Sequence, residues 1–218
     1  MLVHDIVAQG NPSAWVLVLH GLGDSKQGWK PVADYLRAPG TGWIFVQAPD
    51  AYYDGWSWFD LQLPDPRPDQ ATVARSLALL RELLIHLETT RGIRAENLAL
   101  MGFSQGCLMA LEVALAHPRR FACVVGISGW VNRLAEYPVA FGAAARQQHI
   151  LMTHGTADQV IPIAVTRPQA QQLQQLGLDL SWREFAKPHG LDPDEEIGLI
   201  RDFLKQCAAR AIAPKQID

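Results

Sequence analysis

The sequence predicts an α/β fold with a mostly parallel central sheet and helices on both faces. Two observations support this. Short apolar segments with the length of buried strands alternate with segments of helical pattern, and such β-α alternation is typical of parallel sheets. No linker long enough to separate domains interrupts the alternation, so the 218 residues are expected to form a single domain spanning 1–218.

The expected strands are rich in aliphatic residues and are five or six residues long: 15–19, 43–47, 97–101, 122–127, 149–153 and 180–185. The expected helices share helix-forming composition or helical spacing of apolar residues: 27–38, 70–90, 105–117, 163–176 and 192–209. The last of these should begin at Asp192, an N-cap acid followed by Pro193. The tail from Ala213 to Asp218 is expected to fray.

Composition narrows the class of protein. A net charge of −3 gives no reason to expect a nucleic-acid partner, and no apolar run approaches the ~18 residues of a membrane helix, so no integral membrane contact is expected. The N-terminus has no basic segment followed by an apolar core, which argues against a secretory signal. Three cysteines without metal-ligand spacing, Cys107, Cys123 and Cys207, favour reduced structural thiols in a cytoplasmic protein.

The pentapeptide Gly102-Phe103-Ser104-Gln105-Gly106 follows an expected strand and precedes an expected helix. In that context a G-x-S-x-G sequence holds its serine on a strained turn with the hydroxyl exposed. The flanking glycines have no Cβ, so strand and helix can approach closely. Ser104 is therefore the candidate nucleophile.

A serine nucleophile needs a base, and the base needs an orienting carboxylate. Asp158 follows the expected strand 149–153, and His189 follows the expected strand 180–185. They satisfy the chain order serine, acid, histidine and lie at carboxyl ends of strands, where parallel sheets bind ligands. Asp24 is the competing acid, but it precedes the serine and is better suited to bracing its own loop.

The segment His20-Gly21-Leu22-Gly23 forms a tight loop after the first expected strand. Its amides can point inward, and the backbone N–H groups of Leu22 and Gln105 are the candidate oxyanion donors. Because these donors belong to the main chain, the side chains at 22 and 105 are expected to matter little to the chemistry. His20 and His154, each beside a glycine, are expected to shape their loops through structural hydrogen bonds rather than to react.

Four motifs in register resemble the phospholipase/carboxylesterase family, which includes acyl-protein thioesterases and small carboxylesterases: Leu19–Ser25, Gln47–Pro49, Gly102–Gly106 and His154–Asp158. The resemblance runs from about Trp15 to the last helix. It implies an α/β-hydrolase that cleaves carboxylic esters or thioesters. It also implies that Ser104, Asp158 and His189 are catalytic and that Leu22 and Gln105 supply the oxyanion amides. Cys107 departs from the small residue usual after the elbow, but a buried cysteine should not impair activity.

The segment 50–69 should lie over the site, because it follows the carboxyl end of a strand. Its aromatic residues either anchor the loop or line the acyl pocket. Trp56 and Trp58, with Trp130 after another strand, are the tentative substrate-binding residues. Three prolines in residues 64–68 are expected to exclude helix and sheet there. These rings, together with the absence of a large lid domain, predict a preference for short- to medium-chain acyl esters.

The expected function is therefore that of a serine carboxylesterase working through a Ser-His-Asp triad and an acyl-enzyme, with no cofactor and no metal. An acyl-protein thioesterase or lysophospholipase on the same fold is the alternative. A non-catalytic binding protein is a remote one, because no triad or elbow residue is lost. The expected partner is a small ester or thioester substrate, and the chain is expected to be a monomer or homodimer.

Overall fold

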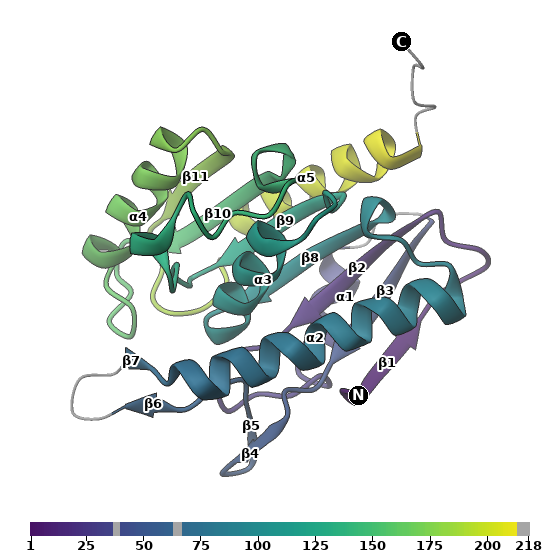
Figure 1. Ribbon diagram of the computed structural model, residues 1–218, viewed down its shortest axis with the longest axis horizontal. Helices are drawn as coiled ribbons and strands as arrows, with labels where there is room; N and C mark the ends of the chain where they lie inside the picture. Colours follow the sequence, from purple (N-terminus) through teal and green to yellow (C-terminus); the bar gives the residue numbers. More distant parts are fainter. Residues whose placement is uncertain (37–39, 63–66, 213–218) are drawn as a thin grey trace.

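Seven strands form the central sheet of the computed structural model, which describes residues 1–36, 40–62 and 67–212 (Figure 1). In spatial order they are β1 (His4–Val7), β3 (Thr41–Val46), β2 (Ala14–Leu19), β8 (Leu98–Phe103), β9 (Cys123–Ile127), β10 (His149–Gly155) and β11 (Asp179–Phe185). All neighbours pair in parallel except β1, which runs antiparallel to β3. The strand order reverses between β2 and β8, and parallel sheets bind ligands at the carboxyl side of such a reversal.

The six expected strands are confirmed, with ends shifted by one or two residues. The edge strand β1 was not predicted. It is only four residues long, and the polar pair His4-Asp5 fills half of it, so it lacks the apolar run of the buried strands. Its pairing with β3, from His4 with Val46 to Val7 with Trp43, makes it a strand.

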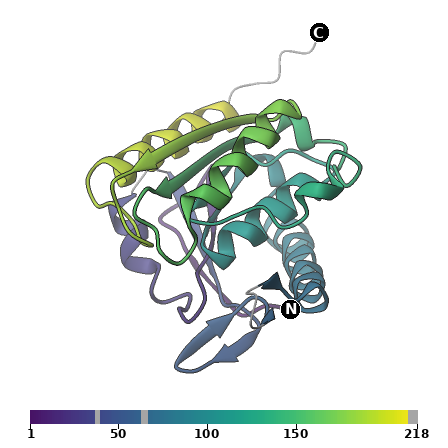
Figure 2. The ribbon, with the colours of Figure 1, turned by 90° about the vertical axis from the view of Figure 1, so that its left-hand side faces the viewer.

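Helices cover both faces of the sheet, as predicted (Figure 2). One face carries α2 (Gln70–Arg91), α3 (Gln105–Ala116) and α4 (Ile163–Gln175), and the other carries α1 (Lys30–Tyr35) and α5 (Glu195–Ile212). Short 3-10 turns lie at Ala95–Asn97, Leu134–Glu136 and Ala145–Gln147. Among the helices that the structure describes, none combines the length and apolarity needed to cross a membrane.

Two helix boundaries differ from the expectation. α1 begins at Lys30, because residues 27–29 form a turn, and the expected residues 37 and 38 lie outside the described chain. α5 begins at Glu195, three residues after the predicted start. Asp192 still serves as its cap, since Oδ1 of Asp192 accepts the N–H of Glu195 at 2.8 Å and that of Glu196 at 3.2 Å. The expected fraying of Ala213–Asp218 also lies outside the described residues.

Helix α3 is the buried axis of the domain. Every residue from Gln105 to Leu115 is buried, because α3 packs on the sheet beneath α2 and the segment 129–148. The apolar side chains of α2 close this layer from Val73 to Leu87. Burying each large aliphatic side chain contributes about 1.5–3 kcal/mol, so the layer holds the start of α3 firmly against the sheet.

The described residues of the segment 50–69, which are 50–62 and 67–69, contain two short pairs of antiparallel strands rather than a structureless loop. β4 (Asp50–Tyr52) pairs with β5 (Gly55–Ser57), and β6 (Leu61–Gln62) pairs with β7 (Arg67–Pro68). The first hairpin extends from the body of the molecule (Figure 2). The expectation that prolines exclude sheet was wrong at Pro68, because an edge strand tolerates a residue without an N–H. Pro64 and Pro66 lie outside the described residues. No large lid joins β9 to β10, where 128–148 contains only 3-10 turns.

Candidate active site

Ser104 sits on a strained turn at the carboxyl end of β8. Its φ of 54° and ψ of −117° are unusual for a residue with a side chain and match the geometry of a nucleophile elbow. A Cβ on Gly102 would lie 2.1 Å from the Gly106 carbonyl oxygen, and one on Gly106 would lie 2.1 Å from the Leu19 carbonyl oxygen. Only glycine fits at either position, so strand, turn and helix are held by steric contact of the main chain.

The structure brings Ser104, His189 and Asp158 into one hydrogen-bonded chain. Nε2 of His189 lies 3.0 Å from the Ser104 hydroxyl oxygen, and Nδ1 of His189 lies 2.8 Å from Oδ2 of Asp158. The carboxylate accepts from the Nδ1–H group, which leaves the Nε2 lone pair facing the serine hydroxyl. The imidazole can therefore take the serine proton, which is the arrangement that general-base activation requires.

Asp158 is fixed by its own turn. Oδ1 accepts the N–H groups of Val160 at 2.9 Å and Ile161 at 2.8 Å, while Oδ2 faces His189. Burial opposes ionisation and is the largest single effect on this carboxyl. The hydrogen bonds from Ile161 and His189 outweigh it, so the pKa of Asp158 is lowered from its usual value. The competing acid, Asp24, instead accepts the N–H of Ser25 at 2.7 Å and braces its own loop, as expected.

The loop after β2 lies beside the elbow, because Leu19 pairs with Gly102 in the sheet. A Cβ on Gly21 would lie 3.4 Å from Cβ of Ser104. The loop is held from the far side by Trp56, whose N–H donates to the Asp24 carbonyl at 3.0 Å and whose carbonyl accepts the Gly23 N–H at 2.9 Å. Leu22 and Gln105, the expected oxyanion donors, therefore lie on two segments that flank Ser104.

The side chain of Gln105 has a role that the sequence did not reveal. Its Oε1 accepts the Trp58 N–H at 2.9 Å and the Ser57 hydroxyl at 3.2 Å, and its Nε2 donates to the Phe59 carbonyl at 2.9 Å. The expectation that this side chain matters little was incomplete, because the amide ties segment 57–59 to the start of α3. No local signal in the sequence indicated this role, because the partners of the amide belong to a distant segment of the chain.

The three tentative substrate-binding tryptophans differ in their placement. Trp58 has no exposed surface, and its indole N–H donates to the His20 carbonyl at 2.8 Å. It is a core anchor, so the expectation that it walls an open pocket was wrong. Trp56 and Trp130 are half-buried, and Trp130 packs edge-on against Phe59 with ring centroids 6.1 Å apart.

His20 and His154 are structural, as expected. Nδ1 of His20 donates to the Gly21 carbonyl at 2.7 Å and its Nε2 accepts the Ala48 N–H at 3.1 Å, while Nε2 of His154 donates to the Ile161 carbonyl at 2.8 Å. Burial lowers the pKa of both imidazoles, so each is held neutral in the fold. His20 shapes the loop beside Ser104, and His154 shapes the Asp158 turn.

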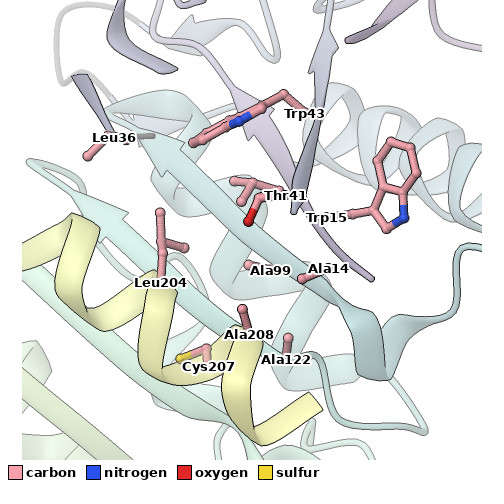
Figure 3. Close-up of a pocket in the computed structure, with 11 residues that line it drawn as sticks. Ala14, Trp15, Leu36, Thr41, Trp43, Ala99, Ala122, Leu204, Cys207 and Ala208 are labelled. Carbon is pink, nitrogen blue, oxygen red and sulfur yellow. The ribbon is translucent and has the colours of Figure 1, made fainter. Parts of the chain in front are cut away.

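The three cysteines belong to the core of the molecule. All three are buried, and burial raises the pKa of Cys107 to about 12, which makes its thiol inert. Cys207 borders a small pocket of about 10 Å³ between α5 and the sheet, lined mainly by apolar side chains including Leu36, Trp43 and Leu204 (Figure 3). This pocket holds no more than about one water molecule and lies apart from Ser104, so it is not an acyl pocket.

Comparison with known proteins shows the family to which the chain is similar. A family model described as Phospholipase/Carboxylesterase matches residues 4–208. Acyl-protein thioesterase 1 of Schizosaccharomyces pombe is 34% identical over 180 residues, covering 75% of this chain and 78% of the relative. A probable carboxylesterase SOBER1-like of Arabidopsis thaliana is 28% identical over 206 residues, covering 88% of this chain and 78% of that one.

Solved structures show the same fold. The crystal structure of esterase PE8 superposes with a TM-score of 0.87 at 23% identity, covering 94% of this chain and 99% of that one. At this identity the likeness concerns the fold alone. The α/β-hydrolase architecture expected from the sequence is confirmed.

Proposed function

The chain belongs to the phospholipase/carboxylesterase family of serine hydrolases, and we propose that it cleaves carboxylic esters by acyl transfer through Ser104, His189 and Asp158. The observation that carries the proposal is the unbroken hydrogen-bonded chain from the Ser104 hydroxyl through both ring nitrogens of His189 to Asp158. Such a chain, built on a strained serine turn, is the geometry of an activated nucleophile.

In the acylation half-reaction, Oγ of Ser104 bonds to the ester carbonyl carbon while its proton passes to Nε2 of His189. The carbonyl oxygen becomes an oxyanion, stabilised by the N–H groups of Leu22 and Gln105. When the tetrahedral species collapses, the bond to the leaving group breaks. The departing alcohol takes the proton from Nε2, and the acyl group remains on Ser104. Asp158 keeps the imidazole in the required tautomer and stabilises its charged form.

Deacylation repeats these steps with water. The water oxygen bonds to the acyl carbon as one of its protons passes to Nε2. Collapse then breaks the bond to Ser104, returns the proton to Oγ and releases the carboxylic acid. A thioester would follow the same path with a thiol as leaving group.

A short- to medium-chain acyl ester is the proposed substrate. Half-buried Trp56 and Trp130 stand on the segments that follow β4 and β9, near the elbow, and large rings there limit the space for a long chain. A thioester substrate is the second candidate, favoured because a relative 34% identical to this chain is named an acyl-protein thioesterase.

Paired substrate series test this proposal. The kcat/KM values for p-nitrophenyl butyrate, octanoate and palmitate should rise and then fall, since each added methylene gains up to about 0.8 kcal/mol only while the pocket has room. Matched acyl thioesters measured with a thiol reagent give the leaving-group preference. Trp56→Ala should move the optimum to longer chains.

Trp58→Ala is the matched control for that shift, because its ring lies in the core. It should lower the melting temperature without moving the optimum. The proposed chain-length preference would be contradicted if p-nitrophenyl palmitate, presented as a soluble monomer, gave a higher kcat/KM than the butyrate and octanoate esters.

A further inference from the structure

The loop that carries His189 contains a buried ion pair. Lys187 lies two residues before His189 and is 3% exposed, and its partner Glu196, in the first turn of α5, is fully buried. Nζ of Lys187 lies 2.6 Å from each carboxylate oxygen of Glu196. In the sequence these residues resemble ordinary surface charges of a loop and a helix start, so nothing marked them as partners.

The pair holds the main chain on both sides of His189. Besides Glu196, Nζ of Lys187 donates to the Gly190 carbonyl at 2.7 Å. Oε2 of Glu196 accepts the Asp192 N–H at 2.8 Å. These hydrogen bonds join both ends of the loop 187–192 to Glu196 of α5, and His189 lies between the two ends.

The same loop is joined to the turn that carries Asp158. The Lys187 carbonyl accepts the Ala157 N–H at 3.2 Å, and the preceding Phe185 carbonyl accepts the Thr156 N–H at 2.8 Å. A Cβ on Gly155 would lie 2.3 Å from the Lys187 carbonyl oxygen, so the two loops are in close contact. Any displacement of Lys187 therefore changes the position of His189 relative to both Asp158 and Ser104.

Stability alone does not account for a buried pair at this place. Removing two charges from water costs several kcal/mol per ion, and apolar residues of similar volume are often as stabilising as the pair they replace. Burial lowers the pKa of Lys187, and the adjacent Glu196 carboxylate opposes that shift. An apolar pair would not supply the hydrogen bonds to the Gly190 carbonyl and the Asp192 N–H.

We propose that Lys187 and Glu196 are positioning residues that hold His189 within reach of the Ser104 hydroxyl. This inference rests on the proposed role of His189 as the base. Neither side chain contacts the Ser104 or His189 side chains through any hydrogen bond that the described residues show. Their effect is on the geometry of the imidazole and should appear in the rate of acyl transfer.

The test replaces both charges at once, so that neither is left buried without a partner. Lys187→Met with Glu196→Met should give a folded protein with a melting temperature at or above that of the wild type. Its kcat for p-nitrophenyl butyrate should fall about 10- to 100-fold with KM unchanged, because a displacement of about 1 Å at a catalytic group has an effect of that size. The downfield proton resonance of the His189–Asp158 hydrogen bond should broaden, which a purely structural pair would not cause.

Glu196→Asp keeps both charges but withdraws the carboxylate by one methylene, and it should lower kcat in the same direction if the double variant does not fold. The matched control is Arg119→Gln with Glu88→Gln, because Arg119 precedes the amino end of β9, whereas the site lies at the carboxyl ends of the strands, and it pairs with Glu88 at 2.9 Å. This control should leave kcat unchanged.

A folded Lys187→Met/Glu196→Met variant, or a folded Glu196→Asp variant, with wild-type kcat and an unchanged imidazole resonance would overturn the inference. His189→Ala, measured beside them, separates the two hypotheses. If it retains activity, the proposed base is wrong. If it is inactive while the pair variants are fully active, only the positioning role fails.

Discussion

The elbow that carries Ser104 and the loop that carries His189 are held in place by different forces. At the elbow, Gly102 and Gly106 bring main chains into contact, and Ser104 has a strained backbone. In the loop that carries His189, Gly190 has open space around it, since a Cβ there would meet nothing within 4 Å. The loop there is shaped by the buried charges of Lys187 and Glu196 and by hydrogen bonds to neighbouring turns.

The position of Ser104 is thus controlled by steric contacts, and the position of His189 by polar contacts. Close-packed main chain resists displacement strongly, because interiors are dense and overlap is costly. A hydrogen-bonded loop resists less and depends on each partner. The nucleophile should therefore tolerate almost no change of shape, while the base should tolerate added volume but not the loss of a polar partner.

The largest effect is expected at the nucleophile. Ser104→Ala should leave the fold intact, because the elbow is held by glycines, and should lower kcat/KM by at least about 10⁴-fold. Hydrolysis of p-nitrophenyl butyrate by purified, folded variant measures this. Substantial turnover in that protein would remove Ser104 from the mechanism.

A somewhat smaller effect is expected at the acid. Asp158→Asn should favour the wrong imidazole tautomer and lower kcat by about 10²- to 10⁴-fold. Asp24→Asn is the matched control on the elbow side, where the aspartate braces a loop through Ser25. If Asp24→Asn proved crippling and Asp158→Asn mild, the assignment of the acid would be reversed.

The two glycines on opposite sides of the site test the comparison directly. Gly106→Ala forces a Cβ into the Leu19 and His20 carbonyl oxygens, and overpacking of this kind costs about 1–3 kcal/mol or more. It should lower both the melting temperature and the activity. Gly190→Ala should be accepted, with stability unchanged or raised by up to about 1 kcal/mol. Equal sensitivity of the two positions in thermal unfolding would refute the distinction between steric and polar control.

The smallest effect concerns pH. His20 and His154 have lowered pKa values because they are buried, so below about pH 6.5 the unfolded chain binds protons that the folded chain does not. Stability should therefore be complete above that pH and should decrease as pH falls below it. Calorimetry of the wild type from pH 7.5 to 5 measures the decrease, and His154→Gln should make it shallower. A melting temperature that stays constant or rises on acidification would show that these imidazoles are not held neutral.

How much of the site could be predicted from sequence follows from the same contrast. Sterically controlled features leave local patterns, so Gly102-Phe103-Ser104-Gln105-Gly106 indicated the strand, the turn and the helix together. Chain order and strand ends sufficed to predict that Asp158 and His189 would meet. Polar control leaves no local pattern, because its partners come from distant segments. The Gln105 amide binds residues 57–59, and Lys187 pairs with a residue of the next helix.

The sequence also did not predict which aromatic side chains of the segment 50–69 would be buried. Trp56 lies in β5 and Trp58 directly follows that strand, yet Trp56 is half-buried and Trp58 has no exposed surface. In the core, the Trp58 ring donates its indole N–H to the His20 carbonyl, a contact with a distant segment that the local sequence does not indicate. The edge strand β1 was not predicted for a related reason, since it lacks an apolar run and becomes a strand through its backbone pairing with β3.

Covalent labelling with a fluorophosphonate, followed by peptide mass mapping, tests whether Ser104 is the nucleophile that His189 activates. We expect one phosphonyl group per chain, located on Ser104, with esterase activity lost in proportion to labelling and with slow labelling of His189→Ala. Activity that disappears while Ser104 stays unmodified, or that persists when Ser104 is fully labelled, would contradict the claim that His189 activates Ser104 as the acyl acceptor.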